Sequence, residues 1–265
     1  MTVAGWRGSA TWWGVEVGGR TAAWLDELGP ALVPWYAGVS PCHDLSHVVR
    51  VAVLAERIAA AEGAGADAAV LAALLHDAGH GVSDRAGTDD HEERSARIAA
   101  DLLRDRVPAP VLAEILDAIS GRRFRKLALP RERVGAVLDD ADNLDALGHI
   151  GVARAFLWLG EHGRQDDQPD PTRDLVALVE RDAAALRRHW AEKLAQLPVA
   201  MRTPTGRQLA VERAERLAAF LLRLEDELAD LLAGTSTPTH SAPLTLPNET
   251  PADPRLDDPG LRNRP

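Results

Sequence analysis

The sequence predicts an all-α protein, and three observations support that prediction. Ala and Leu are abundant, whereas aromatic residues make up 4% of the chain with only 3 Phe and 1 Tyr, a composition that favours helices over sheets. Apolar residues recur at spacings of three and four along most of the chain, as on one face of a helix. Gly and Pro stand at the ends of these periodic segments, where they begin and end helices. A length of 265 residues allows one domain with a large core.

Charge and cysteine content limit the partners and the compartment. The net charge of -10 and the pI near 5.4 argue against a nucleic-acid-binding surface, because binding to a phosphate backbone needs a basic face. The single cysteine, Cys42, excludes an internal disulfide and fits a reducing cytoplasm. No apolar run approaches the roughly 20 residues of a membrane span, and residues 1–20 lack the hydrophobic region of a secretory signal. We therefore expect a cytoplasmic protein that binds neither nucleic acid nor a membrane.

The two ends of the chain differ in composition from its middle. Residues 1–39 hold five of the 7 tryptophans among Gly and Pro, which favours an arm whose rings pack on the body over a lid that covers a site. Residues 234–265 are rich in Pro, Thr, Asp and Asn without periodicity, which indicates a disordered tail. The predicted organisation is an N-terminal arm (1–39), a helical domain (40–233) and this tail.

Capping residues, glycines and prolines divide the helical domain into a series of expected helices. A helix over 44–62 would start at Asp44 and carry His47 in a stripe with three apolar residues, so His47 points toward the core. A helix over 67–78 is apolar nearly all round, which marks it as central and buried. Further helices are expected over about 89–107, 110–121, 130–148, 149–161, 172–197 and 203–234.

The adjacent pair His76-Asp77 is the most informative feature of the chain. It ends the apolar run 70–75, so Asp77 meets the negative end of a buried helix dipole, and a cation is the simplest compensation. Taken alone, His47 and Asp142 are more often hydrogen-bonded core residues than ligands. Asp142 shares a helix face with Asp145, and acids so close repel one another unless a metal or basic partners intervene. Together these residues indicate a divalent metal site.

Their order also resembles the H…HD…D pattern of the HD-domain phosphohydrolase superfamily. The stretch from Asp44 to Val51 is similar to that superfamily's D-x-x-H-x-x-R-V, and 74–80 is similar to its L-L-H-D-x-G-(H/K). Residues 140–154 resemble the D-A-D-x-L-D-A-L-G-x-I-G-x-A-R block of one small bacterial branch. Residues 189–194 and 201–207 resemble two later blocks of the same branch. The resemblance covers about residues 40–232 and implies a single HD-domain helical bundle. Some members of that branch are nucleotide pyrophosphohydrolases that use a manganese-type ion.

The resemblance implies a ligand set of His47, His76, Asp77 and Asp142. Mixed nitrogen and oxygen donors fit Mn, Co, Ni or Fe better than Mg. Relatives with two metals need two further histidines between the HD pair and the last aspartate; His91 could be the first, but no histidine lies between His91 and Asp142. We therefore expect one divalent ion per chain.

The expected mechanism is attack of a metal-bound hydroxide on phosphorus. Asp77 would serve both as a ligand and as the group that orients the water. His80, one helical turn after His76, is a candidate electrophile or acid toward the leaving oxygen, or an exposed cap of its helix. His91 is a candidate second acid or base, or a solvated residue.

Four basic residues are candidates for binding a phosphorylated substrate. Arg50 follows His47 by three residues, and neutralising nearby acids is the favoured alternative for it. Arg154 and Lys193 lie in the blocks shared with the bacterial branch, and Arg122 begins the basic run 122–126, which would by default be a solvated loop. The neighbouring Cys42 and His43 are discounted as a thiol–imidazole pair, because adjacent residues on an extended segment point apart.

The sequence thus predicts a metal-dependent phosphohydrolase acting on a nucleotide or related small phosphorylated metabolite, with release of pyrophosphate from nucleoside triphosphates as the sharper form. Two alternatives stay open: an HD-fold di-iron oxygenase, which needs the missing histidine, and a non-catalytic ligand-binding protein. The long helices and the tryptophan-rich arm are compatible with a homodimer.

Overall fold

Helices build the fold. The computed structural model describes residues 17–80, 91–121, 133–162 and 175–232, without the side chains of 162, 175–181 and 232. These residues form α-helices and one short 3-10 helix, with no strand among them, which confirms the all-α prediction. The α-helices are α1 (Gly19–Tyr36), α2 (Leu45–Glu62), α3 (Ala66–Leu75), α4 (His91–Leu103), α5 (Ala109–Ser120), α6 (Arg133–Asp145), α7 (Gly148–His162), α8 (Leu175–Glu192), α9 (Leu197–Ala200) and α10 (Pro204–Leu232). Within the described ranges, no helix has the length and apolar character needed to cross a membrane.

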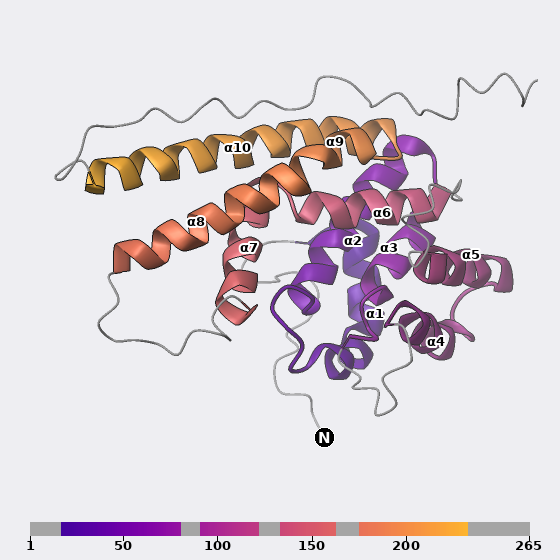
Figure 1. Ribbon diagram of the computed structural model, residues 1–265. Coiled ribbons are helices and arrows are strands. Elements are labelled where there is room, and N and C mark those ends of the chain that lie inside the picture. Colours follow the sequence, from indigo (N-terminus) through magenta and orange to yellow (C-terminus); the bar gives the residue numbers. More distant parts are fainter. Residues whose placement is uncertain (1–16, 81–90, 122–132, 163–174, 233–265) are drawn as a thin grey trace, which may run out of the picture.

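Helix α3 lies at the centre of the body (Figure 1). It packs against α1, α2, α4, α5 and α6, and every residue from Ala68 to Leu75 is buried. Because other helices cover this helix on all sides, none of its faces meets solvent, which explains why the segment is apolar all round. The buried side of α2 carries the predicted stripe of His47, Val51, Leu54 and Ile58. The core therefore surrounds the C-terminal end of α3, where the HD pair follows.

Helix α1 was not predicted, and it forms part of the core. Leu25, Leu28 and Leu32 are buried along one side of it. The Glu56 carboxylate of α2 accepts hydrogen bonds from the backbone N–H groups of Arg20 and Thr21, at 2.8 and 2.9 Å, and so satisfies the first turn. Trp24 and Trp35 pack against the core, as expected of the arm's tryptophans, whereas residues 1–16 lie outside the described part of the chain. The arm's inner part is thus a packed helix.

The segment after α7 differs from the single long helix expected over 172–197. Helix α8 ends at Glu192, and a 3-10 helix (Leu194–Gln196) and the short α9 follow before α10 begins at Pro204. The backbone of Lys193 leaves the helical region, with φ of -137° and ψ of -58°, so the chain turns at this residue. Helices α8 and α10 pack together beside α7 (Figure 1). The predicted tail lies outside the described residues.

Candidate metal centre and the adjoining cavity

Three helices bring the predicted ligands to one place. Asp44 caps α2 by accepting a hydrogen bond from the His47 backbone N–H at 3.0 Å, which fixes His47 in the first turn. His76 and Asp77 follow directly after the end of α3, and Asp142 lies on α6. Because α2, α3 and α6 pack against one another, side chains from three separate parts of the sequence meet at this junction.

The four side chains lie within a few ångströms of each other. His47 Nε2 is 3.5 Å from Asp77 Oδ2 and 3.4 Å from Asp142 Oδ1. His76 Nε2 is 3.3 Å from Asp77 Oδ1 and 3.9 Å from Asp142 Oδ1. Two imidazole nitrogens and two carboxylates thus face one small volume, which suits a cation bound by mixed nitrogen and oxygen ligands.

Hydrogen bonds at Nδ1 fix the tautomers of His76 and His47. His76 Nδ1 lies 2.7 Å from the Ala73 carbonyl oxygen, which can only accept, so Nδ1 carries the proton. His47 Nδ1 donates in the same way to the Asp145 carboxylate at 2.8 Å. Both Nε2 atoms are buried and lack a hydrogen-bond partner among the described residues. Each Nε2 therefore faces carboxylates from a buried position, an arrangement that is costly unless a proton or a metal ion supplies positive charge between them.

The charge balance of the site also favours a cation. Burial lowers the pKa of His47, but the adjacent carboxylates of Asp142, Asp145 and Asp77 outweigh burial and raise that pKa to about 10. Burial raises the pKa of Asp77, and the neighbouring histidines outweigh it and hold the pKa well below the ordinary value. Without a metal the site would thus hold a proton on His47. A divalent ion would replace that proton and supply the positive charge the carboxylates require.

Behind the ligands, Asp145 anchors His47 and is itself neutralised. Its carboxylate accepts two bonds from Arg50, from Nε to Oδ1 and from Nη2 to Oδ2, each of 2.9 Å. Arg154 Nη1 lies 3.3 Å from Asp145 Oδ2. Burial raises the pKa of Asp145, but the bonds from His47 and Arg50 outweigh it and lower the pKa to about 2. The Arg50 guanidinium is thus engaged by Asp145, the alternative the sequence favoured for it over substrate binding.

A second group of histidines lies beside the centre and nearer the surface. His43 Nδ1 is 2.8 Å from Asp77 Oδ2, and its ring stacks on His80 with centroids 4.3 Å apart. His80 Nε2 is 3.7 Å from Asp77 Oδ1, and the His80 ring is 4.1 Å from that of His91. Burial and the neighbouring imidazoles lower the pKa of His80 to about 4. At neutral pH His80 is then an uncharged imidazole, which suits the electrophile role better than the acid role.

Gly79 explains how His91 reaches this group although it begins another helix. A Cβ atom at Gly79 would lie 2.4 Å from the His91 carbonyl oxygen, so only glycine allows α4 to approach so closely. The Gly79 N–H donates to Ser95 Oγ at 2.9 Å, and Arg94 Nε donates to the Gly79 carbonyl at 3.1 Å. The glycine of the HD motif therefore seats the N-terminal end of α4 against the site.

The two histidine groups differ in burial. His43, Asp77 and His80 also bring ligand atoms within 4.8 Å of one another, as do His47, His76 and Asp142. However, the His43 and His80 side chains are 39% and 28% exposed, whereas those of His47 and His76 are 0% exposed. Solvent can satisfy the outer rings, so they leave no buried lone pair that requires a metal.

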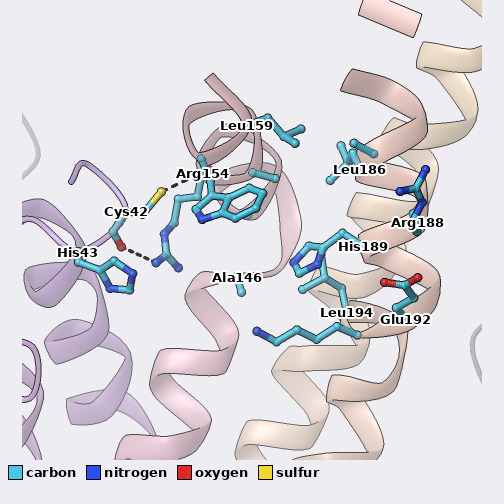
Figure 2. A pocket seen from close by; sticks show the side chains of 15 residues that line it. Cys42, His43, Ala146, Arg154, Leu159, Leu186, Arg188, His189, Glu192 and Leu194 are labelled. Carbon is cyan, nitrogen blue, oxygen red and sulfur yellow. Dashed lines mark hydrogen bonds between the residues drawn. The ribbon is translucent and has the colours of Figure 1, made fainter. Parts of the chain in front are cut away.

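An open cavity of about 570 Å³ adjoins the centre. His43 and Cys42 lie on one side, Arg154 reaches in from α7, and His189 and Glu192 of α8 lie opposite (Figure 2). Lys193 and Leu194 complete the far wall, because the chain turns there after α8. The cavity thus brings together two predicted phosphate-binding residues, Arg154 and Lys193, and it extends along an apolar surface.

Sequence reasoning did not select two residues that the structure places at the site. His43 was considered only with its neighbour Cys42, but its partner is Asp77, 34 positions further on. Cys42 instead lies 3.5 Å through Sγ from the Arg154 carbonyl. Asp145 was noted for its repulsion of Asp142, and its spacing after that ligand could have marked it as a supporting residue. Arg122 lies outside the described residues.

A family model and a relative match the part of the chain that carries the metal centre. The HD domain model matches residues 44–147, from the cap of α2 to just beyond α6. YpgQ of Bacillus subtilis (strain 168) is 32% identical over 205 residues, which is 73% of this chain and 88% of YpgQ. The chain therefore belongs to the HD-domain family, as the sequence resemblance predicted.

Solved structures of similar proteins share the fold. The crystal structure of B. subtilis YpgQ in complex with ADP matches with a TM-score of 0.57 and 26% identity, over 79% of this chain and 97% of that one. A predicted HD superfamily hydrolase from an uncultured Thermotogales bacterium matches with a TM-score of 0.56 and 26% identity, over 77% of this chain and 92% of that one. An HD-superfamily hydrolase from Bacillus thuringiensis matches with a TM-score of 0.56 and 25% identity, over 78% and 97% of the two chains.

Proposed function

We propose that this protein is a metal-dependent phosphohydrolase that holds one divalent ion of the Mn, Co, Ni or Fe type. The observation that carries the proposal is the pair of buried Nε2 atoms of His47 and His76, which face Asp77 and Asp142 with no other partner among the described residues. Hydrogen-bonded core histidines would not leave these lone pairs unmatched. A bound divalent ion would lower the pKa of a water molecule and polarise a phosphoryl oxygen.

Residues around the metal centre then have separate roles in holding water and in binding the substrate. Asp77 has one oxygen toward His76 and the other toward His43, so it can hold a water molecule on the cavity side of the centre. His80, uncharged at neutral pH, can donate one N–H to an oxygen of the substrate. Arg154 and Lys193 line the cavity and provide positive charge for phosphate oxygens.

The finer proposal is that the substrate is a nucleotide, with pyrophosphate release from nucleoside triphosphates as its sharpest form. Two observations support a nucleotide: YpgQ was crystallised in complex with ADP, and the cavity beside the metal centre combines cationic residues with an apolar wall.

A substrate panel tests both levels of the proposal. The protein would be assayed with Mn, Co, Ni and Mg over ribo- and deoxynucleotides of every phosphorylation state, with pyrophosphate and orthophosphate detected separately and Asp77→Ala as the blank. Pyrophosphate from triphosphates, absent in the blank, supports the sharper form. Orthophosphate from monophosphates would support a phosphohydrolase whose substrate is a nucleoside monophosphate rather than a triphosphate. No hydrolysis of any phosphorylated compound would contradict the proposal.

A two-metal centre is the second candidate, and the His43, Asp77 and His80 group is the observation that favours it. A two-iron centre would be required for the oxygenase alternative. Metal analysis separates the candidates, because one ion per chain supports the hydrolase with a single metal and two irons support the oxygenase. The exposure of His43 and His80 leads us to expect one ion.

A further inference from the structure

We propose that the cavity between α7, α8 and the segment before α2 binds the nucleoside half of the substrate, with Trp158 stacking on the base. The inference rests on the proposed function, because it assumes that the phosphate end of the substrate lies at the metal centre. It adds a site for the part of the substrate that does not react.

The cavity has a polar end and an apolar end. Its polar end is the side next to the metal centre, where His43 contacts Asp77 and Arg154 lies 3.3 Å from Asp145. Further along α7, the lining changes to Ala155, Trp158 and Leu159, which face Leu186 of α8. A ligand that is charged at one end and apolar at the other, as a nucleotide is, is therefore complementary to this lining, and Arg188 adds a cation to the α8 wall.

Arg154 is held in position for the charged end. Its Nη2 donates to the Cys42 carbonyl at 2.6 Å, and its Nη1 faces the Asp145 carboxylate. Its side chain is 15% exposed and lines the cavity, so part of the guanidinium is accessible to a ligand. Lys193 reaches the same cavity from the turn after α8. Two cations on opposite walls suit a chain of phosphates that extends from the metal centre into the cavity.

Trp158 is the residue suited to the other end. It lines the cavity yet is 50% exposed, a large area for an indole to leave in contact with solvent. A flat nucleobase would cover the ring and gain the stacking energy that bases obtain on exposed aromatic side chains. Glu192 on the facing wall offers a carboxylate that can accept a hydrogen bond from a ribose hydroxyl or a base amino group. The volume of about 570 Å³ lies within the range of small-molecule sites.

The test compares two ligands that differ only in the nucleoside. α,β-Methylene-ADP and methylenediphosphonate share a diphosphonate that resists cleavage at the bridge, and only the first carries a base. Their affinities would be measured by titration calorimetry with Mn²⁺ on the full chain, for wild type, Trp158→Ala and Trp158→Phe. Leu157→Ala is the matched control, because Leu157 neighbours Trp158 on α7 and is 47% exposed but does not line the cavity.

The proposal predicts that wild type binds the nucleotide analogue at least tenfold more tightly than methylenediphosphonate. Trp158→Ala should weaken nucleotide binding about tenfold, the size of the effect when one stacking partner is removed, and leave methylenediphosphonate binding unchanged. Trp158→Phe should retain most of the affinity, and Leu157→Ala should change neither ligand. Equal affinities of wild type for the two ligands, an unchanged nucleotide affinity in Trp158→Ala, or an equal loss for both ligands would overturn the proposal.

These outcomes are separable from failure of the proposed function. If the analogue binds through Trp158 but no phosphorylated compound is hydrolysed, the nucleoside site stands and the hydrolase proposal fails. If the protein hydrolyses other phosphate esters and Trp158→Ala has no effect on nucleotide binding, the hydrolase proposal stands and the nucleoside site fails. Thermal unfolding of each variant confirms that the affinities are measured on folded protein.

Discussion

Two groups of histidines contact Asp77, and they differ in burial and in the partners of their ring nitrogens. His47 and His76 are fully buried, with each Nδ1 bonded to a fixed acceptor and each Nε2 left facing carboxylates. The outer rings of His43, His80 and His91 are partly exposed and lie against one another near the cavity. Burial and a fixed tautomer suit a metal ligand, whereas partial exposure suits a group that meets substrate.

The comparison predicts that the inner pair controls metal content and the outer group controls turnover. The same residue type can serve both because the surroundings decide which nitrogen is available. Asp77 joins the two groups, since its oxygens face His76 on one side and His43 on the other.

Removal of an inner ligand should have the largest effect. In His76→Ala the cation loses one of its nitrogen donors at a site from which solvent is excluded, so bound metal should fall from one ion per chain to near zero and hydrolysis below detection. Mass spectrometry of metals on the purified variant checks this, with circular dichroism to confirm the fold. Retention of a full complement of metal by His76→Ala would contradict the distinction between inner and outer groups.

Substitution of an outer ring should reduce turnover without removing metal. His80→Gln keeps a polar side chain near Asp77 but removes the imidazole and its positioned N–H, so kcat should fall about 100-fold, the size of the effect when one donor to developing charge is lost. Metal content should stay at the wild-type level. Loss of metal in parallel with activity would instead place His80 among the ligands and favour the two-metal candidate.

Weakening the support of an inner ligand should have an intermediate effect. Asp145→Asn leaves the shape of the side chain but removes the charge that binds His47 and Arg50, so the affinity for Mn²⁺ should fall about 10–100-fold. Titration calorimetry measures the change. The control is Asp139→Asn on the same helix, because Asp139 pairs with Arg202 rather than with a predicted ligand. A similar loss of affinity in both variants would indicate general destabilisation.

Metal binding should also stabilise the fold, and this is the smallest effect expected. Free Mn²⁺ at 100 times its Kd should raise the free energy of unfolding by about 2.7 kcal/mol, because only the folded state assembles the site. A thermal shift that is present in wild type and His80→Gln but absent in His76→Ala would match the comparison. An equal shift in all three would show that the ion acts elsewhere.

Much of the inner group could be predicted from the sequence. The stripe on 44–62 places His47 toward the core, and the apolar run before His76 shows that the pair follows a buried helix; the structure confirms both features. Local periodicity is sufficient here because each residue's orientation follows from its own helix. The order of the four predicted ligands also matches one family motif. That match indicates that they belong to one site, which the periodicity of a single helix could not.

The outer group and the first helix could not be predicted in the same way. His43 belongs to the site through Asp77, and a contact across 34 residues leaves no trace in local periodicity. The segment 19–36 contains Pro30 and Pro34, which argue against a helix, yet its leucines fill the core and Glu56 of α2 caps its first turn. In both cases tertiary contacts outweigh the local pattern.

A crystal structure of the protein with Mn²⁺, with anomalous diffraction used to locate the ion, would show directly whether His47 and His76 bind the cation. We predict one anomalous peak per chain, within bonding distance of His47 Nε2 and His76 Nε2 and in contact with carboxylate oxygens of Asp77 and Asp142. A peak bound only by His43 and His80, or no peak at the inner pair under saturating Mn²⁺, would contradict it.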